Sequence, residues 1–282
     1  MNFSSLTKLA TNLSISELKA DLGKINFNQD KTTRLLIKKT KIVNVKIFTK
    51  EKIVLCGGKF VKDFISKNFP KIKIKLNYKD GDEINKNSNL ILLEGDVRLI
   101  LKIERTILNF LQHFSSISSE TKKYVVKLKK TNTKLLDTRK TTCGLRYLEK
   151  YATKMGGAIN HRFGLFDEIL IKDNHISVNK NIRDLVKRAI KNRKGKKITV
   201  EVDNLSQLKK IIGLKFNRVL FDNMNPKNLR KAVKMSKRFY ETEASGGVTF
   251  NNVRKIAATG VKRISVGQIT HSSTNMDFNL TL

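Results

Sequence analysis

The order of apolar and polar positions divides the chain into two regions. In the first hundred residues, apolar positions at helical spacing predict a helix at residues 60–65. Ser14 and Glu17 form a capping-box pattern, which predicts a helix that starts near residue 14 and ends at Gly23. Alternating or continuous apolar runs predict strands at residues 41–49, 72–78 and 90–95. This first region is therefore expected to mix helices and strands.

A long amphipathic helix is predicted next, at residues 97–114. Its apolar positions fall three or four residues apart, on one stripe. The stripe carries Ile100, Ile103, Ile107, Leu111 and Phe114. Such a stripe needs a partner surface to cover it.

Beyond this helix, short apolar strands alternate with amphipathic helices. Six strands are expected, at residues 134–138, 168–173, 198–203, 218–223, 239–245 and 263–268. The helices between them are expected at residues 144–155, 181–193, 206–213, 225–236 and 250–260. Pro226 stands at a first-turn position of one of them. Regular alternation of this kind is typical of parallel βα units.

Polar residues stand at or just past the end of each predicted strand. The set comprises Asp137, Arg139, Lys172, Asp173, Glu201, Asp203, Asp222, Glu243, Ser245 and Gly267. In a barrel of βα units, that end of the strands is where sites are built. A single acid there can equally be the N-cap of the next helix, and this alternative stays open for Asp203. A single site shared by the ends of all six strands explains the whole series better.

Residues 136–176 concentrate cations beside short apolar runs. Arg139, Lys140, His161, Arg162 and Lys172 all fall within these 41 residues. An ordinary solvated face mixes Lys and Glu at no particular position, so this cluster predicts a pocket for a strongly anionic ligand.

The charge balance is extreme, with 58 Lys and Arg against 24 Asp and Glu, a formal net charge of +34. Clustered cations would indicate a nucleic-acid binder. Here the lysines are spread along the chain, and only residues 191–197 form a dense run. No specific nucleic-acid partner is expected.

Compartment and membrane association follow from simple counts. Cys56 and Cys143 are the two cysteines, too few for a disulfide framework or a zinc site. The N-terminal stretch has no secretory-signal pattern, and no apolar run approaches the roughly 20 residues that span a bilayer. A cytoplasmic location without membrane association is expected.

Eight segments, taken in order, resemble the quinolinate phosphoribosyltransferase family, also called carboxylating nicotinate-nucleotide pyrophosphorylases. They are "ERTILNFLQHFSSIS", "LDTRKTTCGLR", "NHRFGL", "LIKDNH", "VEVDNLSQL", "LFDNMNPKNLR", "EASGGVTFNNVRKIAATGV" and "ISVGQITHS". One departure is Cys143, where the family pattern leads us to expect proline. The resemblance implies an N-terminal α+β domain at residues 1–110 and an incomplete TIM-like α/β barrel at residues 111–271. Residues 272–282 are expected to pack on the first domain.

The resemblance also implies an activity. The family transfers phosphoribose from phosphoribosyl pyrophosphate to quinolinate with loss of carbon dioxide, giving nicotinate mononucleotide for NAD synthesis, with Mg²⁺ as cofactor. Lys140, Lys172, Glu201 and Asp222 would be catalytic, and the last two would hold the metal. The implied substrate-binding residues are Arg105, Thr138, Arg139, His161, Arg162, Lys172, Ser245, Gly246, Gly247, Gly267 and Gln268. For His161, a role in holding a loop remains an alternative, and Glu243 could order the neighbouring loop. The final proton donor stays open among Lys140, Lys172 and water.

Assembly is implied as well. The family forms a homodimer, or a hexamer of dimers, in which Arg105 enters the neighbouring subunit's pocket. Competing interpretations are a transferase acting on free nicotinate, a paralogue linked to molybdenum transport, a nucleic-acid binder without catalysis, and a structural relic.

Overall fold

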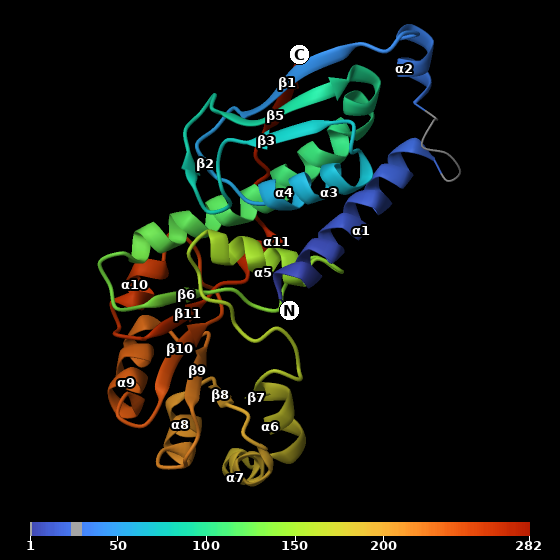
Figure 1. Ribbon diagram of the computed structural model, residues 1–282. Coiled ribbons are helices and arrows are strands. Elements are labelled where there is room, and N and C mark those ends of the chain that lie inside the picture. The colour runs from blue at the N-terminus through green and yellow to red at the C-terminus, as the bar shows by residue number, and fades with distance from the viewer. Residues whose placement is uncertain (1, 24–29) are drawn as a thin grey trace. The chain divides into compact units, whose positions relative to one another are not determined.

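The computed structural model describes residues 2–23 and 30–282 and divides into two compact units (Figure 1). The first unit comprises Met1–Glu120, Tyr147–Gly157 and Ser273–Leu282, and the second comprises Thr121–Arg146 and Ala158–Ser272. The division into domains at residues 110 and 271 stays a prediction, because compactness does not measure independent folding. The first boundary between the units follows Glu120, inside a helix, whereas the predicted boundary follows residue 110. The first unit also includes residues 147–157, which the prediction placed in the barrel.

An antiparallel sheet organises the first unit, with strand order β12-β1-β5-β3. Its strands are β1 (Ile42–Thr49), β3 (Lys73–Leu76), β5 (Asn89–Asp96) and β12 (Phe278–Thr281). The strands predicted at 41–49, 72–78 and 90–95 are thereby confirmed. The pattern did not reveal β12, which is only four residues long and pairs with β1 through Lys46 and Thr281. A second pair, β2 (Ile53–Val54) and β4 (Glu83–Ile84), and helix α3 (Gly58–Asn68) complete this part.

Helix α1 (Phe3–Leu22) corrects the predicted capping box. The helix begins eleven residues before Ser14, and Asn2 caps it by accepting a hydrogen bond from the Ser5 N–H at 2.9 Å. Ser14 is interior, and its hydroxyl donates to the Ala10 carbonyl at 3.0 Å. A Ser-x-x-Glu spacing inside a helix is thus indistinguishable from a cap when the preceding residues are polar. The predicted end is confirmed, because Gly23 follows with a φ of 80°. A short helix, α2 (Lys31–Leu36), was not predicted.

Helix α4 (Val97–Leu128) is longer than the predicted 97–114. The extension is rich in serine, which has poor intrinsic helix propensity. These serines bond outside the helix: Ser119 Oγ accepts from the Val54 N–H at 2.8 Å, and Ser115 Oγ accepts from the Cys56 N–H at 3.0 Å. Ser118 Oγ donates to the Val54 carbonyl at 2.7 Å. The helix continues because tertiary partners satisfy residues that would otherwise favour its end.

The second unit is built on a six-stranded parallel sheet of order β6-β11-β10-β9-β8-β7. The strands are β6 (Lys134–Leu136), β7 (Ile169–Ile171), β8 (Ile198–Val202), β9 (Arg218–Asp222), β10 (Glu241–Ser245) and β11 (Arg263–Ser265). All six predicted strands are confirmed. Strands β6 and β7 end the sheet without a ladder between them among the described residues, so the expected incomplete α/β barrel is confirmed.

Helices connect these strands as the pattern predicted. They are α5 (Arg146–Met155), α6 (Asp173–Asn179), α7 (Ile182–Asn192), α8 (Leu205–Ile211), α9 (Pro226–Ser236), α10 (Val253–Ala257) and α11 (Gln268–His271). The short helices α6 and α11 were not predicted. Figure 1 shows α8 and α9 beside the strands that they connect. Asn204, rather than Asp203, caps α8 by accepting from the Gln207 N–H at 2.9 Å.

The core of the second unit combines strand residues of the sheet with apolar residues of the helices that cover it. Val200, Val219 and Ile264 are fully buried in it. Such continuous apolar strands are what a parallel sheet covered by helices requires. No helix in the described residues has the length and apolar composition to cross a membrane.

Candidate active site

A cavity of about 720 Å³ lies at the carboxyl ends of the parallel strands, within the second unit. Its volume falls in the range of roughly 300–1,000 Å³ found for small-molecule sites. Its lining includes every predicted site residue that the second unit contains: Thr138, Arg139, Lys140, His161, Arg162, Lys172, Glu201, Asp222, Ser245, Gly246, Gly247, Gly267 and Gln268. The fold therefore brings together residues up to 130 positions apart.

One wall of this cavity is cationic and incompletely paired. Arg162 is only 7% exposed, and its Nη1 donates to the Glu168 carbonyl at 2.9 Å. Its Nε is buried and lacks a hydrogen-bond partner among the described residues. Burial lowers the pKa of Arg162, and the nearby charge of Arg139 lowers it further. A buried, unpaired donor costs about 1–3 kcal/mol, which an anionic ligand would recover.

The opposite charge comes from two carboxylates on neighbouring strands, Glu201 at β8 and Asp222 at β9. Glu201 is only 7% exposed, and the Lys172 Nζ lies 3.8 Å from its Oε2. Burial raises the pKa of both Glu201 and Asp222, and the charge of Asp222 raises the pKa of Glu201 further. Two carboxylates that resist ionisation together favour a cation between them or beside them.

The third part of the lining is backbone that follows β10 and β11. Gly246 has a φ of +83°, and a Cβ there would lie 2.3 Å from the Asn223 Oδ1, so only glycine fits. At Gly267, a Cβ would lie 3.1 Å from the Cδ of Lys140. Lys140 is held there because the Thr270 hydroxyl donates to its carbonyl at 2.7 Å. Exposed backbone at such positions suits close approach of a phosphate group.

Comparison with known proteins identifies the family. The C-terminal domain model of quinolinate phosphoribosyl transferase matches residues 117–281, and the N-terminal domain model matches residues 30–115. The chain belongs to the quinolinate phosphoribosyltransferase family. The motif resemblance is thereby confirmed, together with the enzyme class: a phosphoribosyltransferase that decarboxylates quinolinate in NAD synthesis.

Relatives and solved structures of this family cover nearly all of the chain. The "Probable nicotinate-nucleotide pyrophosphorylase (carboxylating)" of Bacillus subtilis is 37% identical over 83% of this chain and 81% of its own. The structure of the Francisella tularensis nicotinate-nucleotide pyrophosphorylase superposes with a TM-score of 0.92, at 37% identity, over 98% of this chain and 96% of its own. The Ehrlichia chaffeensis structure gives 0.90 at 39% identity, over 100% and 98%.

In this phosphoribosyltransferase, the ring of His161 is held by protein groups on both sides. Its Nδ1 accepts from the Arg162 N–H at 2.7 Å, and its Nε2 lies 3.2 Å from the Glu243 Oε1. Of the two roles that the sequence left open, this geometry favours the one that holds the loop. Asp137, fully buried, anchors the same loop by accepting from the His161 N–H at 2.8 Å.

Several lining residues escaped the sequence-based prediction. They include Asn174, Asn223, Thr249, Ser265, His271 and Ser272. Asn223 has a signal in hindsight, since it directly follows Asp222. It adopts a φ of 51° and donates to the Asp222 Oδ2 at 2.7 Å, so it orients a predicted metal ligand. Ser265 and His271 carry no such signal, because their strand and helix ends are defined only by the fold.

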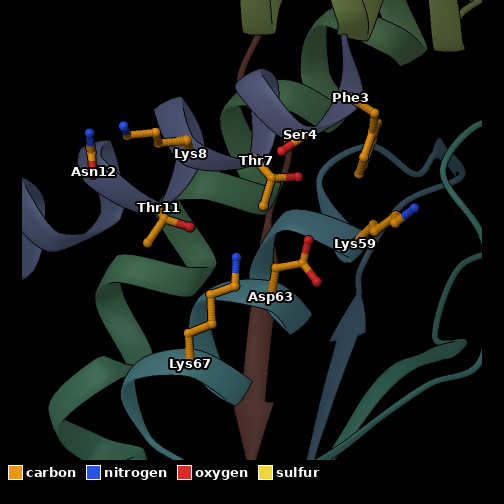
Figure 2. Close-up of a pocket in the computed structure, with 9 residues that line it drawn as sticks. All are labelled: Phe3, Ser4, Thr7, Lys8, Thr11, Asn12, Lys59, Asp63 and Lys67. Atoms are coloured by element: carbon orange, nitrogen blue, oxygen red, sulfur yellow. The ribbon is translucent and has the colours of Figure 1, made fainter.

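The predicted residue outside the second unit is Arg105, which is exposed on α4 in the first unit. That unit has a separate hollow of about 550 Å³, lined by residues of α1 and α3 (Figure 2). Its lining mixes Lys8, Lys59 and Lys67 with Asp63. It contains none of the predicted site residues.

Proposed function

We propose that the cavity of the second unit is the catalytic site, in which Arg139 and Arg162 bind the two carboxylates of quinolinate. The observation that carries this assignment is the buried, unpaired Nε of Arg162 beside a second guanidinium. Two planar cations that repel each other are stabilised by a planar dianion, and quinolinate carries carboxylates on adjacent ring carbons. Lys172 stands on the same wall.

The phosphoribosyl pyrophosphate would occupy the remainder of the cavity. Its 5′-phosphate suits the backbone of Ser245, Gly246 and Gly247 together with Gly267 and Gln268, and its ribose suits the carboxylates of Glu201 and Asp222. Lys140 would neutralise the departing pyrophosphate, and Thr138 orders that loop because its hydroxyl accepts from the Lys140 N–H at 3.0 Å.

The reaction follows from this placement. The quinolinate nitrogen forms a bond to C1 of the ribose as the bond from C1 to the pyrophosphate oxygen breaks. The resulting pyridinium withdraws electrons from the adjacent carbon, so the bond to its carboxylate breaks, carbon dioxide leaves, and the electron pair stays on the ring. A proton then adds to that carbon. Lys140, Lys172 and water remain the candidate donors.

The residues present fit Mg²⁺. Glu201 and Asp222 supply carboxylate oxygens, the ligands that this hard cation prefers, and Mg²⁺ is typically bound by one or two carboxylates plus substrate phosphates. The described residues contain no cluster of three metal-ligating side chains, which agrees with a metal held partly through the substrate. When bound, the ion would stabilise negative charge on the leaving pyrophosphate.

A homodimer with shared sites completes the proposal. Arg105 is exposed on α4, available to a second copy of the chain. Arg105→Ala and Lys140→Ala proteins should each be nearly inactive. After subunit exchange, mixed dimers should carry one site with both residues intact, restoring as much as about a quarter of wild-type activity. No recovery despite exchange would place Arg105 in its own subunit's site. A cytoplasmic location and the absence of a specific nucleic-acid partner stay part of the proposal.

The quinolinate assignment is tested by Arg162→Ala, with Arg230→Ala, an exposed arginine on α9, as the control. Loss of a charge-assisted partner should cost about 1.5–3 kcal/mol, seen mainly in KM for quinolinate. The KM for phosphoribosyl pyrophosphate should change little. Equal damage to both substrates, or product formed from nicotinate in place of quinolinate, would overturn the assignment.

A further inference from the structure

Five residues of the second unit form a closed circuit of polar contacts behind the cavity. The circuit runs through His161, Arg162, Glu168, Arg218 and Glu243, and only His161 and Arg162 line the cavity itself. Of the other three, Glu168 directly precedes β7, Arg218 lies on β9 and Glu243 lies on β10. They therefore connect the substrate-facing loop to the strands of the sheet.

The first half of the circuit leads from Glu243 to the backbone of Arg162. The Glu243 Oε1 lies 3.2 Å from the Nε2 of His161, and the His161 Nδ1 accepts the N–H of Arg162 at 2.7 Å. A ring nitrogen that accepts a hydrogen bond carries no hydrogen, so the hydrogen of the neutral ring is on Nε2 and points at Glu243. The carboxylate thus selects the tautomer that can hold the Arg162 backbone.

The second half returns from the Arg162 side chain to Glu243. Arg162 Nη1 donates to the Glu168 carbonyl at 2.9 Å, and the Glu168 Oε1 accepts from the Arg218 Nη1 at 2.8 Å. The Arg218 Nε lies 3.6 Å from the Glu243 Oε2. Both the backbone and the guanidinium of Arg162 are therefore tied to the same carboxylate by different routes.

Glu243 is a rigid anchor for both routes. It is fully buried, Arg263 Nε donates to its Oε2 at 3.0 Å, and the Ser265 hydroxyl donates to its Oε1. Burial opposes its charged form, but the hydrogen bond from His161 and the interactions with Arg263 and Ser265 outweigh burial and lower its pKa to about 2. The carboxylate is therefore ionised at neutral pH.

We infer that Glu243 is a positioning residue for quinolinate binding: through His161 and Arg218 it holds Arg162 in place at the lining of the cavity. Such control is needed because Arg162 is buried beside the like charge of Arg139. Without fixed partners the guanidinium would turn away from its neighbour. The inference rests on the proposed assignment of Arg162 to quinolinate.

Glu243→Gln breaks the circuit while keeping the side chain's shape. An amide has one acceptor oxygen, and the circuit needs two, one toward His161 and one toward the arginines. If the amide oxygen faces Arg263, the amide NH₂ faces the His161 Nε2. His161 must then adopt the other tautomer, which places its Nδ1–H against the Arg162 N–H. If the amide oxygen faces His161, the amide NH₂ and the Arg263 Nε–H are two donors facing each other.

Glu241→Gln is the matched control. Glu241 lies two residues away on β10 and pairs with the same two arginines, its Oε2 at 3.0 Å from the Arg218 Nε and its Oε1 at 3.5 Å from the Arg263 Nη1. It is 41% exposed and makes no described contact with His161. The two variants change charge equally and disturb the same arginines, but Glu241 is more exposed and makes none of the described contacts that Glu243 makes with His161 and Ser265.

Glu243→Gln should raise KM for quinolinate roughly tenfold or more, leaving KM for phosphoribosyl pyrophosphate within about twofold. Glu241→Gln should change either constant less than about threefold. Equal loss toward both substrates, or equal effects of the two variants, would overturn the inference. Arg162→Lys, assayed in parallel, distinguishes failure of this inference from failure of the proposed role of Arg162. If Arg162→Lys leaves KM for quinolinate unchanged, the assignment of Arg162 itself is wrong.

The wild-type enzyme offers a second readout that needs no variant of Glu243. In ¹⁵N-labelled protein, His161, identified among the four histidines by difference from His161→Asn, should show the tautomer protonated at Nε2. Its two-bond correlations should not change when quinolinate binds. Protonation at Nδ1, or a switch on adding quinolinate, would overturn the inference even if Glu243→Gln failed to fold.

Discussion

Glu201 and Glu243 lie at the same level of one sheet, yet their surroundings shift their pKa values in opposite directions. Both pair in register with Leu220 of β9, Glu201 from β8 and Glu243 from β10. Burial raises the pKa of Glu201, whereas hydrogen bonds and the charge of Arg263 lower the pKa of Glu243 to about 2 despite burial. One carboxylate is left without enough partners, and the other has a full set.

The difference teaches how one layer of a barrel separates binding from positioning. On the cavity side, unsatisfied charge is an energetic cost that the proposed substrate and metal would relieve. Around Glu243, the arginines Arg218 and Arg263 satisfy the carboxylate permanently, so it can orient other groups without reacting. Each of the following tests changes one side of this comparison.

The largest expected effect is on activity when the cavity-side charge is removed. Glu201→Gln should lower kcat at least about 100-fold, because a preorganised charge at the reacting centre is lost. Asp203→Asn, an exposed acid just after the same strand that does not line the cavity, should stay within about threefold. Steady-state kinetics at saturating quinolinate, phosphoribosyl pyrophosphate and Mg²⁺ measures both. Near-normal turnover by Glu201→Gln would remove Glu201 from the catalytic group.

For stability, the ranking of the two carboxylates should be reversed: substitution of Glu243 should have a larger effect than substitution of Glu201. Glu243→Ala leaves Arg218 and Arg263 without their shared buried partner and should destabilise the fold by about 3 kcal/mol or more. Glu201→Gln relieves an under-paired buried charge, so its midpoint of thermal unfolding should equal or exceed that of the wild type. If the two variants lose the same stability, the contrast between satisfied and unsatisfied carboxylates is wrong.

The smallest effect is the dependence of stability on pH. The pKa of Glu243 is lowered from an ordinary 4.5 to about 2, so its contribution is present above pH 4.5 and is lost as pH falls toward 2. The pKa of Glu201 is raised, so its contribution is favourable below its ordinary 4.5 and declines as pH rises through the folded-state value.

Unfolding midpoints measured from pH 2 to 8 should show both signs. The advantage of wild type over Glu243→Gln should shrink as pH falls below 4.5. Any advantage of Glu201→Gln over wild type should appear at neutral pH and vanish in acid. A constant difference across the whole range in either pair would contradict the assigned shift.

Much of the architecture could be read from the chain because apolar periodicity reflects burial directly. The six parallel strands and the stripe of α4 are confirmed for that reason. Failures occurred where tertiary partners outweigh local preference. Ser14 is helical because α1 begins at Phe3. The serines after Phe114 remain helical because they exchange hydrogen bonds with the backbone of Val54, accepting from its N–H and donating to its carbonyl. The four-residue strand β12 depends on pairing with β1 and has no pattern of its own.

The sequence by itself determined the family and the six parallel strands, and it predicted that Arg139, Arg162 and Lys172 meet anionic substrates at the ends of those strands. It could not rank Glu201 against Glu243, because each is an acid within a short apolar strand. Only the tertiary structure decided that Arg218 and Arg263 reach one carboxylate while the other faces the cavity. Charge interactions depend on distance and burial in three dimensions, and spacing along a chain specifies neither.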